Sequence, residues 1–206
     1  MFESLIGAIV GIGLAASCGF RVFVPMLVMS IAAKAGQLEL TDGWGWIGSW
    51  PAIVCFGVAT LVEFGGYCIP WLDNLLDAAA SPAAVIAGTI ATAACVSEMS
   101  PWLQWSTAII AGGGAAGLVQ SLTVAVRGTS TATTGGLGNP IVAAVEFVSS
   151  AVLSVLAIIA PILAVLLLCV VAYLLIRRFT RRKRRLASTS SRVGIPAGRA
   201  DSGGGG

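Results

Sequence analysis

The sequence predicts an all-α membrane protein with about five transmembrane helices and short broken or re-entrant segments. Hydrophobic residues make up 57% of the chain and charged residues only 10%, whereas about a quarter of the residues in soluble domains are charged. Several apolar runs are about 20 residues long, the length that spans a hydrocarbon core of ~30 Å. We therefore expect residues 1–178 to form one polytopic transmembrane domain.

Charge is divided sharply along the chain. Residues 1–176 hold three basic and eight acidic residues, whereas residues 177–206 hold nine Lys or Arg and one Asp. A basic block directly after an apolar run predicts a cytoplasmic C-terminus. We expect 179–206 to be a disordered cytoplasmic tail that contacts anionic lipid headgroups. Five spans in a bacterial cytoplasmic (inner) membrane would then place the N-terminus outside and Lys34 inside.

The first half of the chain predicts two membrane segments joined by a polar loop. Residues 4–33 would form a helix of about 45 Å, too long for one straight span, so it must tilt or break. Residues 17–19 (Ser-Cys-Gly) and Pro25 offer the breaking chemistry. The loop 34–50 carries three Trp that suit a headgroup-level aromatic belt. A second helix is expected over 51–69.

The second half predicts shorter and more broken elements. We expect a short amphipathic helix over 71–80, helices over 83–96 and 103–126, and a polar stretch over 127–140 that folds back between helices. The apolar stretch 141–176 is too long for one span and is divided near residues 149–150 into a half-helix and a helix kinked at Pro161. Similar Gly/Ala-rich segments at 11–17 and 112–117 suggest a weak inverted repeat.

Five ionisable residues are expected at or near membrane depth: Arg21, Glu63, Asp73, Asp77 and Glu146. A guanidinium at membrane depth costs about 2.5–3.5 kcal/mol even on insertion scales, so Arg21 needs a carboxylate, a water-filled cavity or an anionic ligand. A structural salt bridge to Glu63 or Glu146 and an anion contact at a broken helix are both open interpretations. Arg127 is expected at the membrane interface.

Asp73, Asn74 and Asp77 share one face of the short amphipathic helix. Two carboxylates and an amide could coordinate a hard cation through oxygen. The alternative is that they form the solvated face of an interfacial helix. Which metal, if any, binds here is open.

The polar stretch 127–140 offers hydroxyls, unhindered backbone and a helix start at its end. Free N–H groups before Pro140 favour an anion, whereas carbonyls and hydroxyls favour a cation. Gly135 and Gly136 are expected to supply positive φ or a close backbone approach. A simple external loop is the alternative. The candidate residues are Thr131, Thr133, Thr134, Gly135, Gly136 and Asn139.

Several function classes find no support in the sequence. The chain has no His, which excludes His-ligated metals and His bases. Its five Cys lie in apolar runs and are interpreted as packing residues without disulfides. No nucleotide-binding loop or nucleophile motif occurs. We expect no cofactor, no nucleic-acid partner and no enzymatic activity.

Five separate segments resemble, in order, a bacterial membrane family catalogued as domain of unknown function 4126. They are residues 13–25, 48–51, 69–77, 111–120 and 133–140, and the resemblance covers about residues 5–175. It implies an integral membrane protein without an assigned activity. It also implies that these segments carry the family's shared feature.

We predict a transporter or channel for a small solute or ion, with a polar site near the bilayer midplane. The alternatives are a structural or accessory subunit of a membrane complex, and a protein that handles lipids. Self-association is expected through the Gly-rich face of the 103–126 helix. The predicted site consists of Arg21, Glu63, Asp73, Asn74, Asp77, Thr131, Thr133, Thr134, Gly135, Gly136, Asn139 and Glu146.

Overall fold

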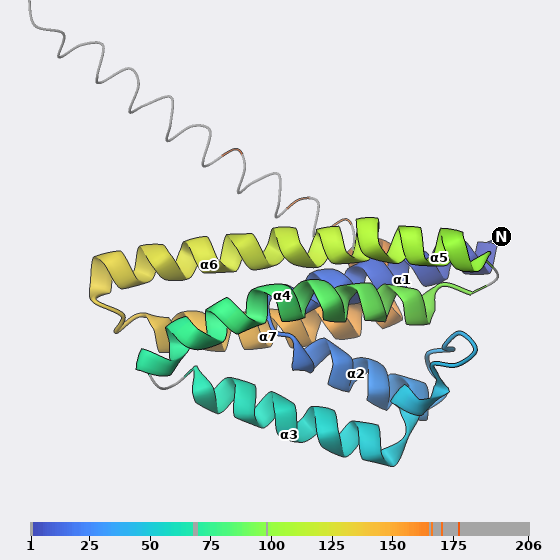
Figure 1. Ribbon diagram of the computed structural model, residues 1–206, viewed down its shortest axis with the longest axis horizontal. Coiled ribbons are helices and arrows are strands. Elements are labelled where there is room, and N and C mark those ends of the chain that lie inside the picture. The colour runs from blue at the N-terminus through green and yellow to red at the C-terminus, as the bar shows by residue number, and fades with distance from the viewer. Residues whose placement is uncertain are drawn as a thin grey trace, which may run out of the picture. The chain divides into compact units, whose positions relative to one another are not determined.

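Every regular element in the described part of the chain is a helix (Figure 1). The computed structural model describes residues 2–67, 70–97, 99–164, 166, 170 and 177, with the backbone alone at 2, 70–75 and 77. The elements are α1 (Phe2–Cys18), α2 (Phe23–Lys34), the 3₁₀ helix η1 (Gly45–Gly48), α3 (Trp50–Gly66), α4 (Pro70–Cys95), α5 (Pro101–Thr107), the π-helix η2 (Ala108–Gly113), α6 (Gly114–Thr134) and α7 (Asn139–Ile159).

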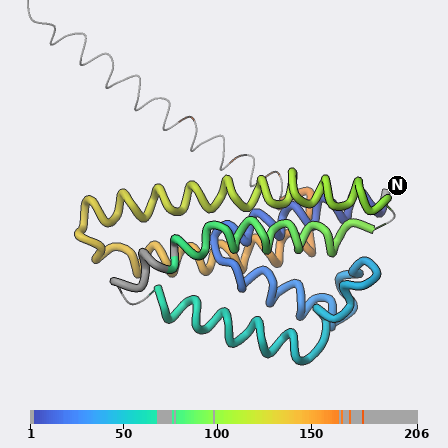
Figure 2. Tube along the Cα trace, viewed as in Figure 1, coloured from blue at the N-terminus to red at the C-terminus, as the bar shows by residue number. Residues whose placement is uncertain are grey.

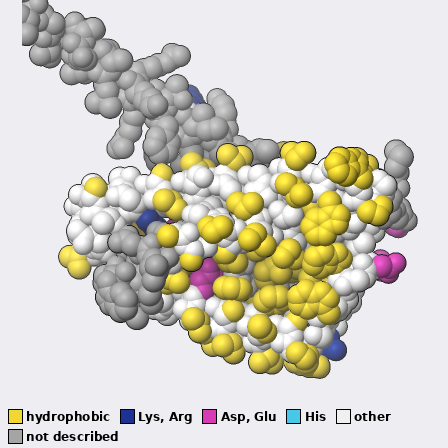
Figure 3. Space-filling view, viewed as in Figure 1, with side chains coloured by type: hydrophobic (Ala, Val, Ile, Leu, Met, Phe, Trp, Pro, Cys, Tyr) yellow, Lys and Arg dark blue, Asp and Glu magenta, His cyan; other side chains and the backbone are white. Residues whose placement is uncertain are grey.

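Three described stretches are long and apolar enough to cross a membrane, namely Ala78–Cys95, Pro101–Thr134 and Asn139–Ile159. Three shorter apolar helices accompany them. Large apolar side chains such as Leu61, Ile110 and Leu118 are more than 70% exposed, and Figure 3 shows apolar side chains across one face of the molecule. The predicted class, an all-α membrane protein, is confirmed. The predicted tail 179–206 lies outside the described residues.

The first two helices form a hairpin in place of the single broken span that we expected. Figure 2 shows α1 running inward from the N-terminal end and α2 returning toward that end. A Cβ on Gly7 would lie 2.2 Å from the carbonyl oxygen of Cys95, and the amide of Thr41 donates to the carbonyl of Ala94 at 2.9 Å. Both outer ends of the hairpin therefore lie beside the C-terminal end of α4. The prediction that Lys34 and the N-terminus lie on opposite sides is wrong.

The reversal occurs at residues 19–22, close to the predicted breaking point. The amides of Gly19 and Phe20 donate to the carbonyls of Ala16 and Ser17, which closes the last turn of α1. A Cβ on Gly19 would lie 2.5 Å from the carbonyl oxygen of Ala116, so only glycine allows the turn to press against α6. Pro25 causes no break, because it sits in the first turn of α2, where no intrahelical amide bond is lost.

The glycine-rich segment 112–117, where η2 joins α6, packs against α4. A Cβ on Gly112 would lie 2.2 Å from Thr92 Oγ1, and one on Gly88 would lie 2.6 Å from the Cβ of Ala116. This close approach of α4 to η2 and α6 is the small-residue packing typical of membrane helices. The face that we expected to mediate self-association is thus covered by α4. Residues 112–117 are followed by further helix, whereas residues 11–17 are followed by the chain reversal. The two segments of the suggested repeat therefore have different backbone courses.

Two predicted breaks do not occur. Helix α4 runs through Pro82 without ending, since membrane helices tolerate an internal proline, and it replaces the predicted helices 71–80 and 83–96. Helix α7 runs through residues 149–150 as one helix. It ends at Ile159, and the next residue, Ala160, leaves the helical region (φ −141°, ψ 70°), because the proline that follows disfavours the helical conformation there. Residues 161–164 are helical again, and the amide of Ala164 donates to the carbonyl of Ala160 at 3.0 Å. The helical stretch is thus interrupted at Pro161, where a kink was expected.

The polar stretch 127–140 is mainly helix. Helix α6 continues to Thr134. Threonine hydroxyls donate to carbonyls four residues earlier, as Thr133 does to Thr129 at 2.9 Å, so these hydroxyls find their partners within the helix. Gly135 and Gly136 then have positive φ values of 64° and 92°, as predicted. The turn is short and largely exposed, so the prediction that this stretch folds back between the helices is wrong.

Tryptophans gather at one end of the helices. The predicted loop Trp residues are joined there by two at the start of α5, with Trp44 and Trp105 packed at 6.4 Å between ring centroids. Trp46 and Trp50 are more than half exposed, as is Trp102. This end, which includes the outer ends of the α1–α2 hairpin, matches the level of a membrane interface.

Candidate functional site

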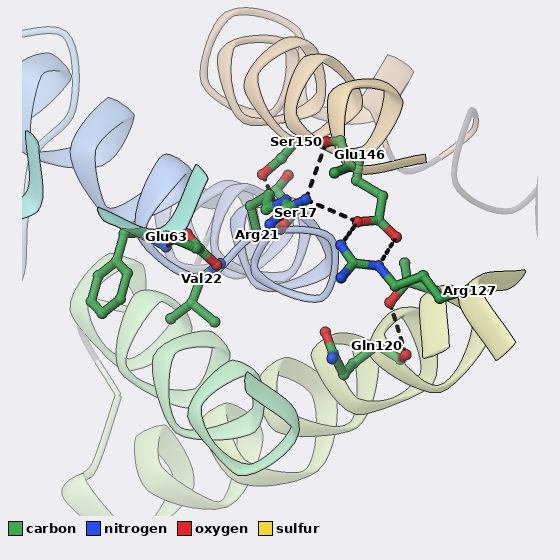
Figure 4. Close-up of polar contacts among 11 residues, drawn as sticks. Ser17, Arg21, Val22, Glu63, Gln120, Arg127, Glu146 and Ser150 are labelled. Carbon is green, nitrogen blue, oxygen red and sulfur yellow. Dashed lines mark hydrogen bonds and ion pairs between the residues drawn. The ribbon is translucent and has the colours of Figure 1, made fainter. Parts of the chain in front are cut away.

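Arg21 lies at the tip of the α1–α2 hairpin and is only 1% exposed. Its Nη2 donates to the carbonyl of Ala143 at 3.2 Å and to Oε2 of Glu146 at 3.3 Å. Both acceptors lie on α7, so the guanidinium ties the hairpin tip to that helix (Figure 4). The sequence predicted a carboxylate partner for Arg21, and Glu146 is that partner.

Arg127 is the second cation of the site, although the sequence placed it at the interface. It lies on α6 and is 4% exposed. Its Nε donates to Oε1 of Glu146 at 3.0 Å and its Nη2 donates to Oε2, so the two side chains form a planar, two-point ion pair. The spacing of polar residues along α6 indicates that Arg127 is buried. Gln120, Thr123 and Arg127 recur at spacings of three and four, and all three are buried.

Tyr67 packs against both guanidinium groups. The central carbons of Arg21 and Arg127 each lie 3.9 Å from the centroid of the Tyr67 ring. The electron-rich faces of the ring attract both cations and partly replace the hydration that they lose on burial. Sequence reasoning missed Tyr67, because an aromatic residue at the end of an apolar helix is common and carries no specific signal.

Glu63 contacts backbone amides and pairs with neither arginine directly. Its Oε1 accepts from the amide of Val22 at 2.9 Å and its Oε2 accepts from the amide of Phe23 at 3.1 Å. Val22 cannot cap α2 with its own side chain. The Glu63 carboxylate therefore satisfies two free amides and the positive end of the helix dipole, a role that the sequence did not predict.

Arg21 keeps donors without an acceptor. Within the described residues, nothing accepts a hydrogen bond from its Nε or from its Nη1, and both atoms are buried. These two nitrogens carry three N–H groups. Buried donors normally find partners, because an unpaired one costs about 1–3 kcal/mol and more when it is charged. The free side of Arg21 is thus suited to water or to an anion.

The site lies nearer to one membrane end than predicted. Glu146 is seven residues into α7, about 10 Å from the start of that helix at 1.5 Å per residue. Arg127 is seven residues from the end of α6, at a similar depth. The hairpin tip therefore meets α6 and α7 nearer to the end formed by residues 134–139 than to the middle of α7.

The other predicted residues do not join this cluster in the described structure. Asn139 is 8% exposed, and its Nδ2 donates to the Thr131 hydroxyl at 3.1 Å. Four more lie exposed or partly exposed along the α6–α7 connection, namely Thr133, Thr134, Gly135 and Gly136. Three have side chains outside the described residues, namely Asp73, Asn74 and Asp77. Among described side chains, no three His, Cys, Asp or Glu come together to hold a metal ion.

The family of the chain is shown by its sequence. The family model described as Domain of unknown function (DUF4126) matches residues 8–181. The chain belongs to this family. No curated protein and no solved structure matches it. The segment matched to the family contains the whole cluster described above: Arg21, Glu63, Tyr67, Arg127 and Glu146. The family description names no activity, so function has to be argued from this cluster.

Proposed function

We propose that this integral membrane protein carries small anions across the bilayer, using Arg21 as the binding residue. The observation that carries the proposal is the free side of Arg21. Its Nε and Nη1 are buried and have no acceptor among the described residues, while its Nη2 is fixed by Glu146 and Ala143. A positioned guanidinium with free donors at membrane depth favours an anionic ligand.

The surrounding helices support this assignment. Transporter sites commonly lie where a membrane helix is interrupted, because free backbone groups and helix ends there can face a ligand. Arg21 lies at such an interruption, between α1 and α2. The hairpin leaves the site about 10 Å from one end of α7, so a ligand would have a short path from that end. Rearrangement of the hairpin would open the longer path.

Orientation, location and assembly remain predictions of this proposal. The nine basic residues from Arg177 onward favour a cytoplasmic C-terminus, and a bacterial inner membrane is the expected location. Self-association is still expected, but through another surface than the face of α6 that α4 covers.

The proposal is tested by anion flux into proteoliposomes that contain the purified full chain. Chloride and nitrate serve as probes. We expect flux well above that of protein-free vesicles, and its loss in Arg21→Gln. Lys34→Gln is the matched control, since it removes one positive charge from an exposed position at the outer end of the hairpin.

A purely structural role predicts another outcome. Arg21 would then serve only to lock the hairpin to α7, as in an accessory subunit of a membrane complex. The wild-type protein would show no flux of either anion, and Arg21→Gln would change only the thermal stability. That pair of results would overturn the proposal.

A further inference from the structure

The two buried carboxylates of the site are held in different ways. Glu146 accepts from three guanidinium nitrogens, Nε and Nη2 of Arg127 and Nη2 of Arg21. Among the described residues, Glu63 accepts only from the neutral amides of Val22 and Phe23. Both residues are less than 10% exposed. The difference decides which carboxylate would take up a proton if the charge of the site changed.

The described part of the site contains two cations and two carboxylates: Arg21, Arg127, Glu63 and Glu146. An anion on the free side of Arg21 would add one negative charge. A charge without compensation is costly in a low-dielectric environment, and groups there neutralise instead. Uptake of one proton would restore the balance.

Glu63 is the group that would accept this proton. Protonating Glu146 would break up its ion pairs with two buried arginines, which is strongly unfavourable. Protonating Glu63 weakens hydrogen bonds to two neutral amides, which contribute less than charged ones. The neutral carboxylic acid can still accept from one amide through its carbonyl oxygen.

The charged and titratable groups around Glu63 come from several helices. Glu63 interacts electrostatically with Arg21 and Cys18 of the hairpin and with Arg127 of α6. Tyr67 follows the end of α3, the helix that carries Glu63. The only charged residue of α2, Lys34, is at the far end of that helix, and η1 has no titratable side chain. Helix α4 carries Asp73 and Asp77, whose side chains lie outside the described residues.

We propose that anion binding at Arg21 is coupled to protonation of Glu63, so that the protein carries one proton with each anion. The inference rests on the proposed anion function. Binding takes one anion and one proton from the same solution, and the Glu63 carboxylate becomes a neutral carboxylic acid. Release on the other side returns both, so one cycle moves no net charge.

The experiment measures proton uptake on anion binding to the full chain in detergent. Titration calorimetry with nitrate is repeated in buffers of different ionisation enthalpy, which gives the number of protons bound per anion. We expect about one for the wild type and about zero for Glu63→Gln, with nitrate binding retained. Glu39→Gln, at an exposed loop position, is the control and should keep the wild-type value.

Two results would overturn the coupling while leaving the anion site intact. One is nitrate binding to the wild type without proton uptake. The other is a value near one in Glu63→Gln. If that variant does not fold, infrared difference spectra of the wild type decide, because nitrate must then produce a protonated carboxyl band. Absence of nitrate binding to the wild type would overturn the anion function itself, and the coupling with it.

Discussion

The pair formed by Arg127 and Glu146 makes a quantitative prediction about stability. Glu146→Gln removes the negative charge that Arg127 and Arg21 share. Breaking a buried ion pair from one side costs about 3–5 kcal/mol, because it leaves a buried charge without compensation. Arg127→Gln should cost less, since Arg21 still donates to Glu146 at 3.3 Å. Combining the two substitutions removes the mismatch that each creates alone.

The measurement is the free energy of unfolding in mixed micelles of mild detergent and dodecyl sulfate. We expect the double variant to be more stable than the sum of the two single effects by about 1–3 kcal/mol, the range measured for residues in one network. Glu39→Gln, in the exposed loop, should change stability by less than about 0.5 kcal/mol. If the two effects simply add within about 0.5 kcal/mol, the ion pair does not stabilise the folded protein and this reasoning fails.

Two further predictions concern the packing and the direction of the helices. Gly112→Ala should lower the thermal unfolding temperature, because the new Cβ would lie 2.2 Å from a threonine hydroxyl on α4. Gly114→Ala, where nothing lies within 4 Å of the new Cβ, should leave that temperature unchanged or raise it. Equal effects of the two variants would contradict the packing. Cysteines introduced at Glu3 and Glu39 in a background without the native cysteines should react from the same side of the membrane, and one at Leu137 from the other; labelling of Glu3 and Glu39 from opposite sides would contradict the hairpin.

The sequence identified Arg21 and Glu146 because charges within apolar runs are costly and few. It also predicted that the chain breaks near residues 17–19 and has positive φ at Gly135 and Gly136. These conclusions depend on local chemistry, because a buried charge needs a partner and a glycine-rich turn uses backbone conformations that other residues avoid. Such features can be read from one sequence.

The reversal at the hairpin tip could not be predicted, because it is decided by contacts between distant residues. A break at 17–19 is compatible with a kinked span or with a turn back. The turn back depends on Gly19 pressing against α6 and on Glu63, 40 residues away, accepting from the amide of Phe23. The burial of Arg127 was hidden for a related reason. The threonines that follow it suggested a loop, but α6 continues through them, and their hydroxyls donate to carbonyls of the same helix.

The hairpin tip and the charged cluster depend on each other. Ending α1 and starting α2 inside the membrane leaves backbone carbonyls and amides without intrahelical partners, and lipid offers none. The partners come from the site itself: Glu63 accepts from the first amides of α2, and the Ser150 hydroxyl donates to the carbonyl of Ser17 at 3.0 Å. Arg21, between these two points, packs on the Tyr67 ring, and among the described residues its side chain donates hydrogen bonds only through Nη2. The interruption therefore explains why charged groups are held here, and the donors that Arg21 keeps free are what remains for a ligand.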